Sequence, residues 1–183
     1  EKNKQALKYV HWMKPEYVEF AKYAMQHFSD SMKYIRADHP NYHELAVLAI
    51  KSNELQLKQI KPERADYGEL AKLAVSSYGL ALQWVPEDRA DYNEIATVAI
   101  LKIPWALQYV ERNRPGYDQL AELALSKEAY TIRYVPTDRY DYAHLASIAV
   151  AQNGKAIWWV PRDEDSYEEL ARAAVEQNPL AFR

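Results

Sequence analysis

The chain has 183 residues, of which 49% are hydrophobic and 27% charged, as expected of a folded domain. Its formal net charge of −3 argues against a general nucleic-acid-binding protein, and the absence of cysteine excludes a disulfide scaffold, a thiol nucleophile and a zinc–thiolate site. No run of 18 apolar residues is present, so the sequence predicts no membrane-spanning helix.

A 25-residue repeat organises the whole chain. One tyrosine recurs at this interval without insertion or deletion, as Tyr17, Tyr42, Tyr67, Tyr92, Tyr117, Tyr142 and Tyr167. The full units are 16–40, 41–65, 66–90, 91–115, 116–140 and 141–165. Residues 166–183 form a truncated copy, and residues 1–15 resemble the tail of a preceding unit. We therefore expect a single repeat domain that is a fragment of a larger protein.

Each unit begins with a predicted α-helix, and unit 66–90 shows the pattern. Its residues at helical spacing form one apolar face, namely Tyr67, Leu70, Ala71, Ala74 and Val75. Asp66 and Glu69 have the spacing of a capping box, in which the aspartate side chain accepts a hydrogen bond from an amide of the first turn. The helix is expected to end near Ser77.

A second, shorter helix is predicted next, at about residues 80–85 of this unit. Turn or helix C-cap residues precede it in several units, namely Gly79, Gly154, Asn53, Asn153 and Asn178. Prolines occur where this helix starts, at Pro104 and Pro179, and where it stops, at Pro86, Pro136 and Pro161.

The two helices of one unit cannot bury their own apolar faces, so each unit needs its neighbours. Two ladders of alanine, which begin at Ala21 and Ala24 and recur every 25 residues, allow the helices to approach closely. The sequence therefore predicts an all-α fold, an α-solenoid of tandem 25-residue helix–turn–helix repeats in a right-handed stack.

One segment also carries a family resemblance. The line from Ala149 to Pro161, AVAQNGKAIWWVP, is similar to a family of short tandem helical repeats of unknown function in bacteria. Such repeats occur in secreted effectors of intracellular bacteria such as Legionella. The resemblance implies the solenoid fold and an effector context, and it implies no catalytic residue.

The repeated tyrosine, carboxylate and arginine positions are all expected to have structural roles. We expect the tyrosine to pack in the core and the carboxylates to cap helices. Arg64, Arg89, Arg114 and Arg139 are expected to pair with the cap aspartates Asp66, Asp91 and Asp141. A further aromatic ladder of Trp84, Tyr109, Tyr134 and Trp159 has Gln59 as its equivalent in another unit, which indicates a half-exposed position.

The sequence gives little support for an enzyme. His39 and His43 have the i, i+4 spacing of metal ligands, but Pro40 and Asn41 lie between them, so the two histidines straddle a predicted helix start. No phosphate-binding glycine loop and no G-x-S-x-G motif occur. We expect no catalytic residue, no metal and no cofactor.

We therefore expect functional residues at positions where the repeat units differ in residue type. Apolar residues replace polar or small ones at Trp158, Tyr140, Leu101, Trp12 and Met13, which we expect to contact a partner, although Trp12 and Met13 could also pack against flanking sequence. A basic stripe covers the N-terminal units, consisting of Lys8, Lys33, Lys58, His11, Arg36 and Lys61. It could bind an acidic partner or an anionic lipid surface, or form an ordinary solvated face.

The leading functional hypothesis is a scaffold or adaptor that binds a protein or peptide, as part of a bacterial secreted effector. The alternatives are a structural or regulatory region attached to an enzyme domain outside this chain, and association with an anionic membrane surface through the basic stripe. A nucleic-acid partner is not expected. The protein is expected in the cytoplasm or secreted into a host cell, and the sequence leaves its oligomeric state open.

Overall fold

A computed structural model describes Leu7 and residues 10–28 and 30–182 of the chain. Within these residues, seven α-helices alternate with six 3-10 helices and no strand occurs. The α-helices are α1 (Pro15–His27), α2 (Tyr42–Ser52), α3 (Tyr67–Ser77), α4 (Tyr92–Lys102), α5 (Tyr117–Lys127), α6 (Tyr142–Gln152) and α7 (Tyr167–Gln177). The 3-10 helices are η2 (Met32–Tyr34), η3 (Glu54–Gln59), η4 (Gly79–Trp84), η5 (Pro104–Tyr109), η6 (Ala129–Tyr134) and η7 (Gly154–Trp159).

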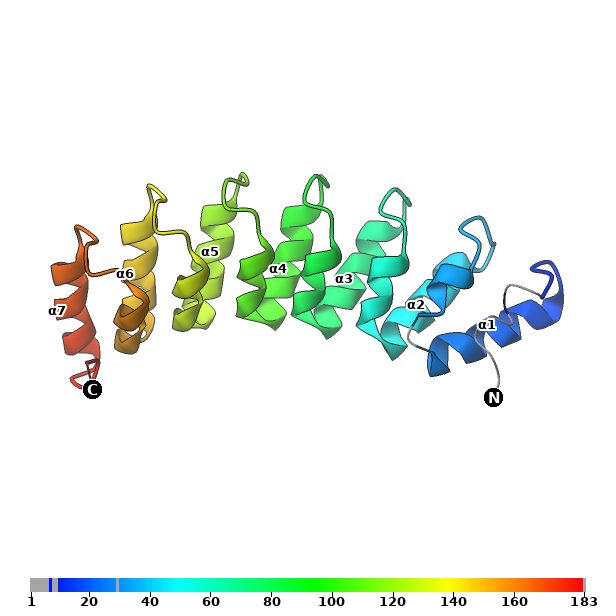
Figure 1. Ribbon diagram of the computed structural model, residues 1–183, viewed down its shortest axis with the longest axis horizontal. Coiled ribbons are helices and arrows are strands. Elements are labelled where there is room, and N and C mark those ends of the chain that lie inside the picture. Colours follow the sequence, from blue (N-terminus) through cyan, green and yellow to red (C-terminus); the bar gives the residue numbers. More distant parts are fainter. Residues whose placement is uncertain (1–6, 8–9, 29, 183) are drawn as a thin grey trace.

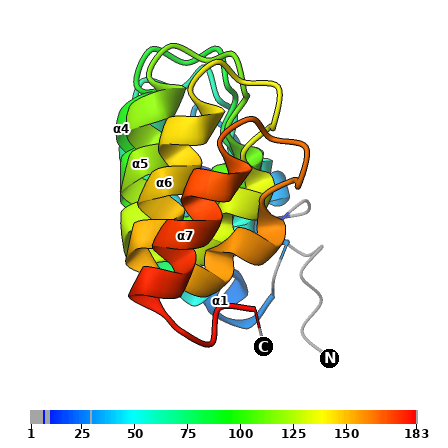
Figure 2. The same cartoon turned by 90° about the vertical axis from the view of Figure 1, so that its left-hand side faces the viewer.

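The units stack in a gently arched row, with α1 and α7 at opposite ends (Figure 1). Seen along the row, the α-helices form one layer and the 3-10 helices lie beside them in a second layer (Figure 2). Each inner α-helix packs against the α-helices on both sides and against the 3-10 helices of its own and the preceding unit. The predicted all-α solenoid of 25-residue units is confirmed.

The second helix of each unit differs from the prediction in type. In unit 66–90 it runs from Gly79 to Trp84 as a 3-10 helix, and the Val85 amide donates to the Leu82 carbonyl. Hydrogen bonds between residues three apart can be completed within six residues, which makes this tighter helix suitable for a short connecting segment. Ala81 and Leu82 point into the core, whereas Gln83 lies on the outer side.

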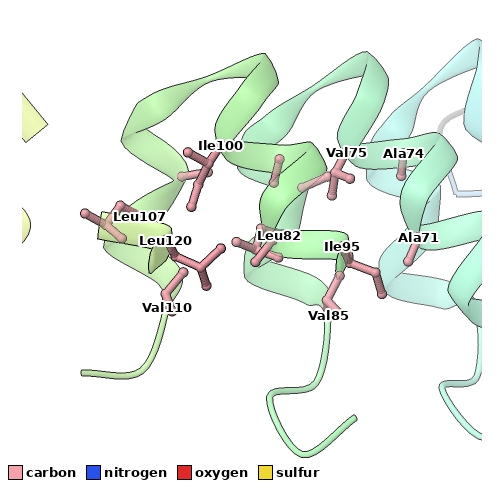
Figure 3. Close-up of a cluster of buried hydrophobic side chains, with 14 of the residues drawn as sticks. Ala71, Ala74, Val75, Leu82, Val85, Ile95, Ile100, Leu107, Val110 and Leu120 are labelled. Atoms are coloured by element: carbon pink, nitrogen blue, oxygen red, sulfur yellow. The ribbon is translucent and has the colours of Figure 1, made fainter. Parts of the chain in front are cut away.

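The core is continuous along the row because side chains of adjacent units interlock. Figure 3 shows Val75, Leu82, Ile95 and Ile100 in the space between neighbouring helices, and each of them is almost fully buried. The two alanine ladders are also buried along the inner units, as at Ala74. Their small side chains bring the α-helices close together while the branched residues fill the remaining space.

The predicted capping box is wrong. The Asp66 carboxylate makes no hydrogen bond to an amide of α3. The backbone at Asp66 has φ −89° and ψ 1°, outside the extended conformation of a side-chain cap, and the Tyr67 amide donates instead to the Arg64 carbonyl at 3.1 Å. A backbone turn therefore begins the helix, and the carboxylate is free to bind a different partner.

Asn53 and Asn153 are the C-cap residues of α2 and α6, as predicted, and both have an extended backbone. Their side chains also accept hydrogen bonds from the amides of Leu55 and Lys155, so the same residues cap the start of the 3-10 helix. Gly79 serves close packing, because a Cβ there would lie 2.4 Å from the carbonyl oxygen of Ala99 in the next unit. The proline at the start of η5, Pro104, is placed as predicted.

Candidate functional site

The repeated tyrosine lies in the core, so its predicted packing role is confirmed. From Tyr17 to Tyr142 all six copies are at most 3% exposed. The Tyr67 hydroxyl donates to the Trp84 carbonyl at 3.0 Å and the Tyr92 hydroxyl to the Tyr109 carbonyl at 2.8 Å, which ties the α-helix to the end of its own 3-10 helix. Burial raises the pKa of Tyr67 to about 12. These phenols are too enclosed to meet a ligand.

The repeated arginine joins one unit to the previous one. Arg89 holds Asp91 through two hydrogen bonds, of 2.8 and 2.9 Å, as predicted. The same guanidinium donates to the Pro62 carbonyl at 2.7 Å and lies over the Tyr67 ring, 4.8 Å from its centre. Hydrogen bonding to Arg89 holds the pKa of Asp91 below its usual range. Arg64 and Arg139 make the equivalent contacts.

Unit 116–140 lacks the aspartate that pairs with the repeated arginine. Gly116 replaces the cap aspartate and has a left-handed backbone, with φ 86°, which favours glycine. Arg114 therefore has no carboxylate two residues ahead, and its guanidinium donates to the Asn93 side chain and still lies 4.2 Å from the Tyr92 ring centre. The arginine thus serves the same structural purpose with an amide partner.

The two closely spaced histidines do not form a metal site together. His39 is buried in the loop before α2, where it lies against the rings of Tyr17 and Trp12. His43 lies on α2 and its Nδ1 is 2.9 Å from the Asp66 carboxylate. Among the described residues, no group of three or more histidine, aspartate or glutamate side chains is arranged to hold a metal ion.

The five predicted partner-binding residues lie in separate places. Leu101 is exposed on the outer side of α4, Tyr140 in the loop before α6, and Trp158 on η7. Trp12 is half-buried beside Arg36 and His39, while Met13 next to it is exposed. The structure therefore does not bring these five residues into one surface.

The basic stripe is partly neutralised. Lys33 pairs with Asp30, and Arg36 pairs with Asp38 at 2.7 Å. Lys58 and Lys61 are exposed and form no ion pair with the described residues. His11 is exposed and stacks beside Trp12. Lys8 lies outside the described residues.

A cluster that the sequence prediction missed lies on the outer side of the 3-10 layer. The guanidinium of Arg133 on η6 lies 4.7 Å from the ring centre of Trp105 on η5, 4.8 Å from that of Tyr134, and 5.4 Å from that of Trp159 on η7. The Arg133 side chain also donates to the Tyr134 hydroxyl at 2.9 Å. Trp158 is exposed on the same 3-10 helix as Trp159, and its indole N–H donates to the Ala181 carbonyl. We name the cluster around Arg133, together with Trp158, the aromatic patch.

The aromatic patch is open to solvent. Trp105 is 42% exposed, Trp158 58% and Trp159 47%. Contacts between η5, η6 and η7 hold the three tryptophans at fixed places along the row. A shallow groove runs between the ends of η4 and η5 and is lined by residues that include Gln83, Pro86, Gln108 and Tyr109. Exposed aromatic side chains and arginine are both enriched at protein-binding surfaces.

Comparison with known proteins gives no match, because no family model, no curated protein and no solved structure matches the chain. The resemblance to bacterial effector repeats therefore stays a prediction. In the part of the chain that the structure describes, every helix is too short or too polar to cross a lipid bilayer.

Proposed function

We propose that the chain is a protein-interaction scaffold that binds a peptide or protein partner on the aromatic patch. The observation that carries this proposal is the exposure of Trp105, Trp158 and Trp159 on one layer of a rigid array. Leaving three indoles half in water is unfavourable by the hydrophobic effect, and a partner would remove that apolar area from water. Their fixed spacing reduces the conformational entropy lost on binding.

Arg133 adds hydrogen-bond donors to this apolar surface. Its guanidinium stacks among three rings and has further N–H groups, which suit the carboxylates or main-chain carbonyls of a peptide. The resemblance to repeats of secreted effectors supports a partner in a host cell. The basic stripe supports lipid binding less well, because Lys33 and Arg36 are already paired with acidic side chains.

Peptide selection tests the proposal directly. Peptides would be selected from a displayed random library on the immobilised chain, and their affinities measured by fluorescence anisotropy. Trp105→Ser and Trp159→Ser are each expected to weaken binding by about tenfold or more, the loss typical of a central aromatic in an interface. Both side chains are half exposed, so circular dichroism and the unfolding midpoint are expected to change little.

Leu101→Ser is the matched control. Leu101 is 52% exposed, similar to Trp159, but lies on the outer side of α4 rather than in the 3-10 layer. Its substitution is expected to leave the affinity unchanged. Selected peptides that bind the wild-type chain and both tryptophan variants equally would show that the aromatic patch is not the binding surface.

A further inference from the structure

One copy of the repeated arginine lacks a carboxylate partner. Arg64, Arg89 and Arg139 each hold the aspartate two residues ahead with two hydrogen bonds. The residue two positions after Arg114 is Gly116, and Arg114 forms no ion pair with the described residues. The repeat therefore supplies a negative charge to this guanidinium in three units but not at Arg114.

Uncharged acceptors hold Arg114 in place of the carboxylate. The guanidinium Nε donates to the Asn93 side chain, and the other two nitrogens donate to the main-chain carbonyls of Glu87 and Arg89. The Asn93 amide group in turn donates to the Pro115 carbonyl at 2.8 Å. A guanidinium has five N–H groups, so donors remain for a further acceptor. Arg114 is half-buried and keeps its positive charge without a counter-charge beside it.

The guanidinium of Arg114 lines a pocket of about 460 Å³. The pocket lies between two successive loops that follow 3-10 helices, and these loops lie along one edge of the row (Figure 1). Gly116 also lines the pocket, and its φ of 86° differs from the −91° of Asp91 at the same repeat position. One glycine thus both removes the carboxylate and changes the path of the loop.

The other two arginines of the pocket already have acidic partners. Arg112 pairs with Asp138, and Arg139 pairs with Asp141. Both pairs join side chains of the described loops, so neither cation needs a further anion. Arg114 is therefore the cation in the lining whose charge an added anion would balance.

An exposed aromatic ring also lines this pocket. Tyr140 is 91% exposed, whereas the same repeat position holds Ala65, Ala90 and Pro115 in earlier units. Tyrosine is enriched where proteins bind other proteins, because its ring supplies contact area at a low cost in conformational entropy. The ring beside an unpaired cation therefore favours a side chain of a partner protein over a free small anion.

We propose that this pocket binds the carboxylate of an acidic side chain from a partner protein, which gives Arg114 the charge that Asp91 gives Arg89. The contact uses the chemistry of the repeat itself, a charge-assisted hydrogen bond between guanidinium and carboxylate. The proposal goes beyond the scaffold function, because no residue that lines the pocket belongs to the aromatic patch. Tryptophan variants of the patch leave this pocket intact, so the two proposals can fail separately.

Nuclear magnetic resonance of the chain labelled with [15N]glycine tests the proposal. The labelled amides are those of Gly68, Gly79, Gly116 and Gly154. Titration with the peptide acetyl-Gly-Glu-Gly-amide is expected to shift the Gly116 signal with a Kd in the millimolar range, because one surface ion pair is weak. Gly68 lies against the paired Arg89 and Asp91 and is the internal control, whose signal is expected to stay in place.

Three variants test the role of charge. Asn93→Asp places a carboxylate beside the Arg114 Nε and is expected to abolish the shift of Gly116. Gln83→Glu makes the same change in net charge on η4, outside the pocket, and is expected to leave the shift unchanged. Asp118 lines the pocket and has no ion pair with the described residues, so Asp118→Asn is expected to tighten binding several-fold. Circular dichroism checks that each variant stays folded.

Two further ligands identify what is recognised. The peptide with glutamine in place of glutamate is expected to shift none of the four signals, and sodium acetate is expected to bind more weakly than the glutamate peptide. Tyr140→Ser is expected to weaken binding of the peptide several-fold and to leave acetate binding unchanged. A Gly116 signal that ignores the glutamate peptide, or responds equally to the glutamine peptide, would overturn the proposal. Equal affinities for acetate and the glutamate peptide would overturn the assignment to a partner protein.

Discussion

The hydroxyl of Tyr92 donates a 2.8 Å hydrogen bond to the main-chain carbonyl of Tyr109, whereas the hydroxyl of Tyr117, one unit later, is equally buried and has no partner. The two rings otherwise have the same place in their units, 25 residues apart. At the same repeat position, one buried hydroxyl is therefore hydrogen-bonded and another is not, so the two can be compared directly.

The first prediction uses this comparison. Tyr92→Phe is expected to lower the free energy of unfolding by about 1 kcal/mol, because it leaves the Tyr109 carbonyl without its donor. Tyr117→Phe is expected to be neutral or slightly stabilising, because it removes a polar group that is buried without a hydrogen bond. Urea unfolding followed by circular dichroism measures both values, and equal losses in the two variants would contradict the prediction.

The second prediction concerns the repeated arginine. Arg139 makes two 2.7 Å hydrogen bonds to Asp141, donates to the Arg112 carbonyl and lies over the Tyr117 ring, and its side chain is only 10% exposed. Arg139→Gln is expected to lower the free energy of unfolding by about 3 kcal/mol, because a nearly buried carboxylate loses its partner.

Arg112→Gln is the control for this change. Arg112 pairs with Asp138 at the surface, and the two side chains are 50% and 64% exposed. An exposed pair contributes at most about 1 kcal/mol, so this variant is expected to unfold close to the wild-type midpoint. If Arg112→Gln is as damaging as Arg139→Gln, then charge, rather than the stacked and bidentate geometry, accounts for the loss.

The third prediction is alkaline unfolding. Burial raises the pKa of Tyr67, Tyr117 and Tyr142 to about 12, above the value of about 10 for an exposed tyrosine. A group whose pKa is raised by folding contributes its full stability below the unfolded pKa and loses it as pH rises towards the folded pKa. The free energy of unfolding is therefore expected to fall between about pH 10 and pH 12.

Absorbance of the tyrosinate ion and helical circular dichroism, recorded together against pH, check this prediction. The signal of the buried tyrosines is expected to rise in the same interval in which helix is lost. Tyr117→Phe removes one of these groups and is expected to move the transition to higher pH. Complete ionisation of all tyrosines with the helices intact would contradict it.

The fourth prediction tests the close approach of the α-helices. Ala149 on α6 is fully buried in an alanine ladder, and Ala151 on the same helix is exposed. Ala149→Val is expected to lower the free energy of unfolding by about 1–3 kcal/mol through overpacking. Ala151→Val carries the same penalty of helix propensity without the steric conflict, so the difference between the two variants in chemical denaturation isolates the packing effect.

Most of the fold could be predicted because the repeat is regular. The apolar spacing around Tyr67 and the small residue Ala74 place an α-helix and its buried side, and both agree with the structure. The type of the second helix could not be predicted, because six residues carry too little periodicity to separate a 3-10 helix from a short α-helix. The role of Asp66 was missed because the capping box and the arginine pair use the same residue types.

The candidate site was less predictable. Trp158 was predicted because its position is polar in other units, and Trp159 was placed in a half-exposed aromatic ladder, but Trp105 was missed because aromatics are common in the repeat. The signal that could have found the whole cluster is Arg133, the one arginine at its repeat position. Which exposed residues share a face depends on how one layer lies over the other, and a single unit does not contain that information.

The contacts of each unit are mainly with its two neighbours, and this pattern bears on how the array responds to force. Among the described residues, contacts run between adjacent units, so a pull along the row is carried from unit to unit in series. A unit that detaches under load releases about 25 residues of chain, so we expect the array to extend in steps of equal length.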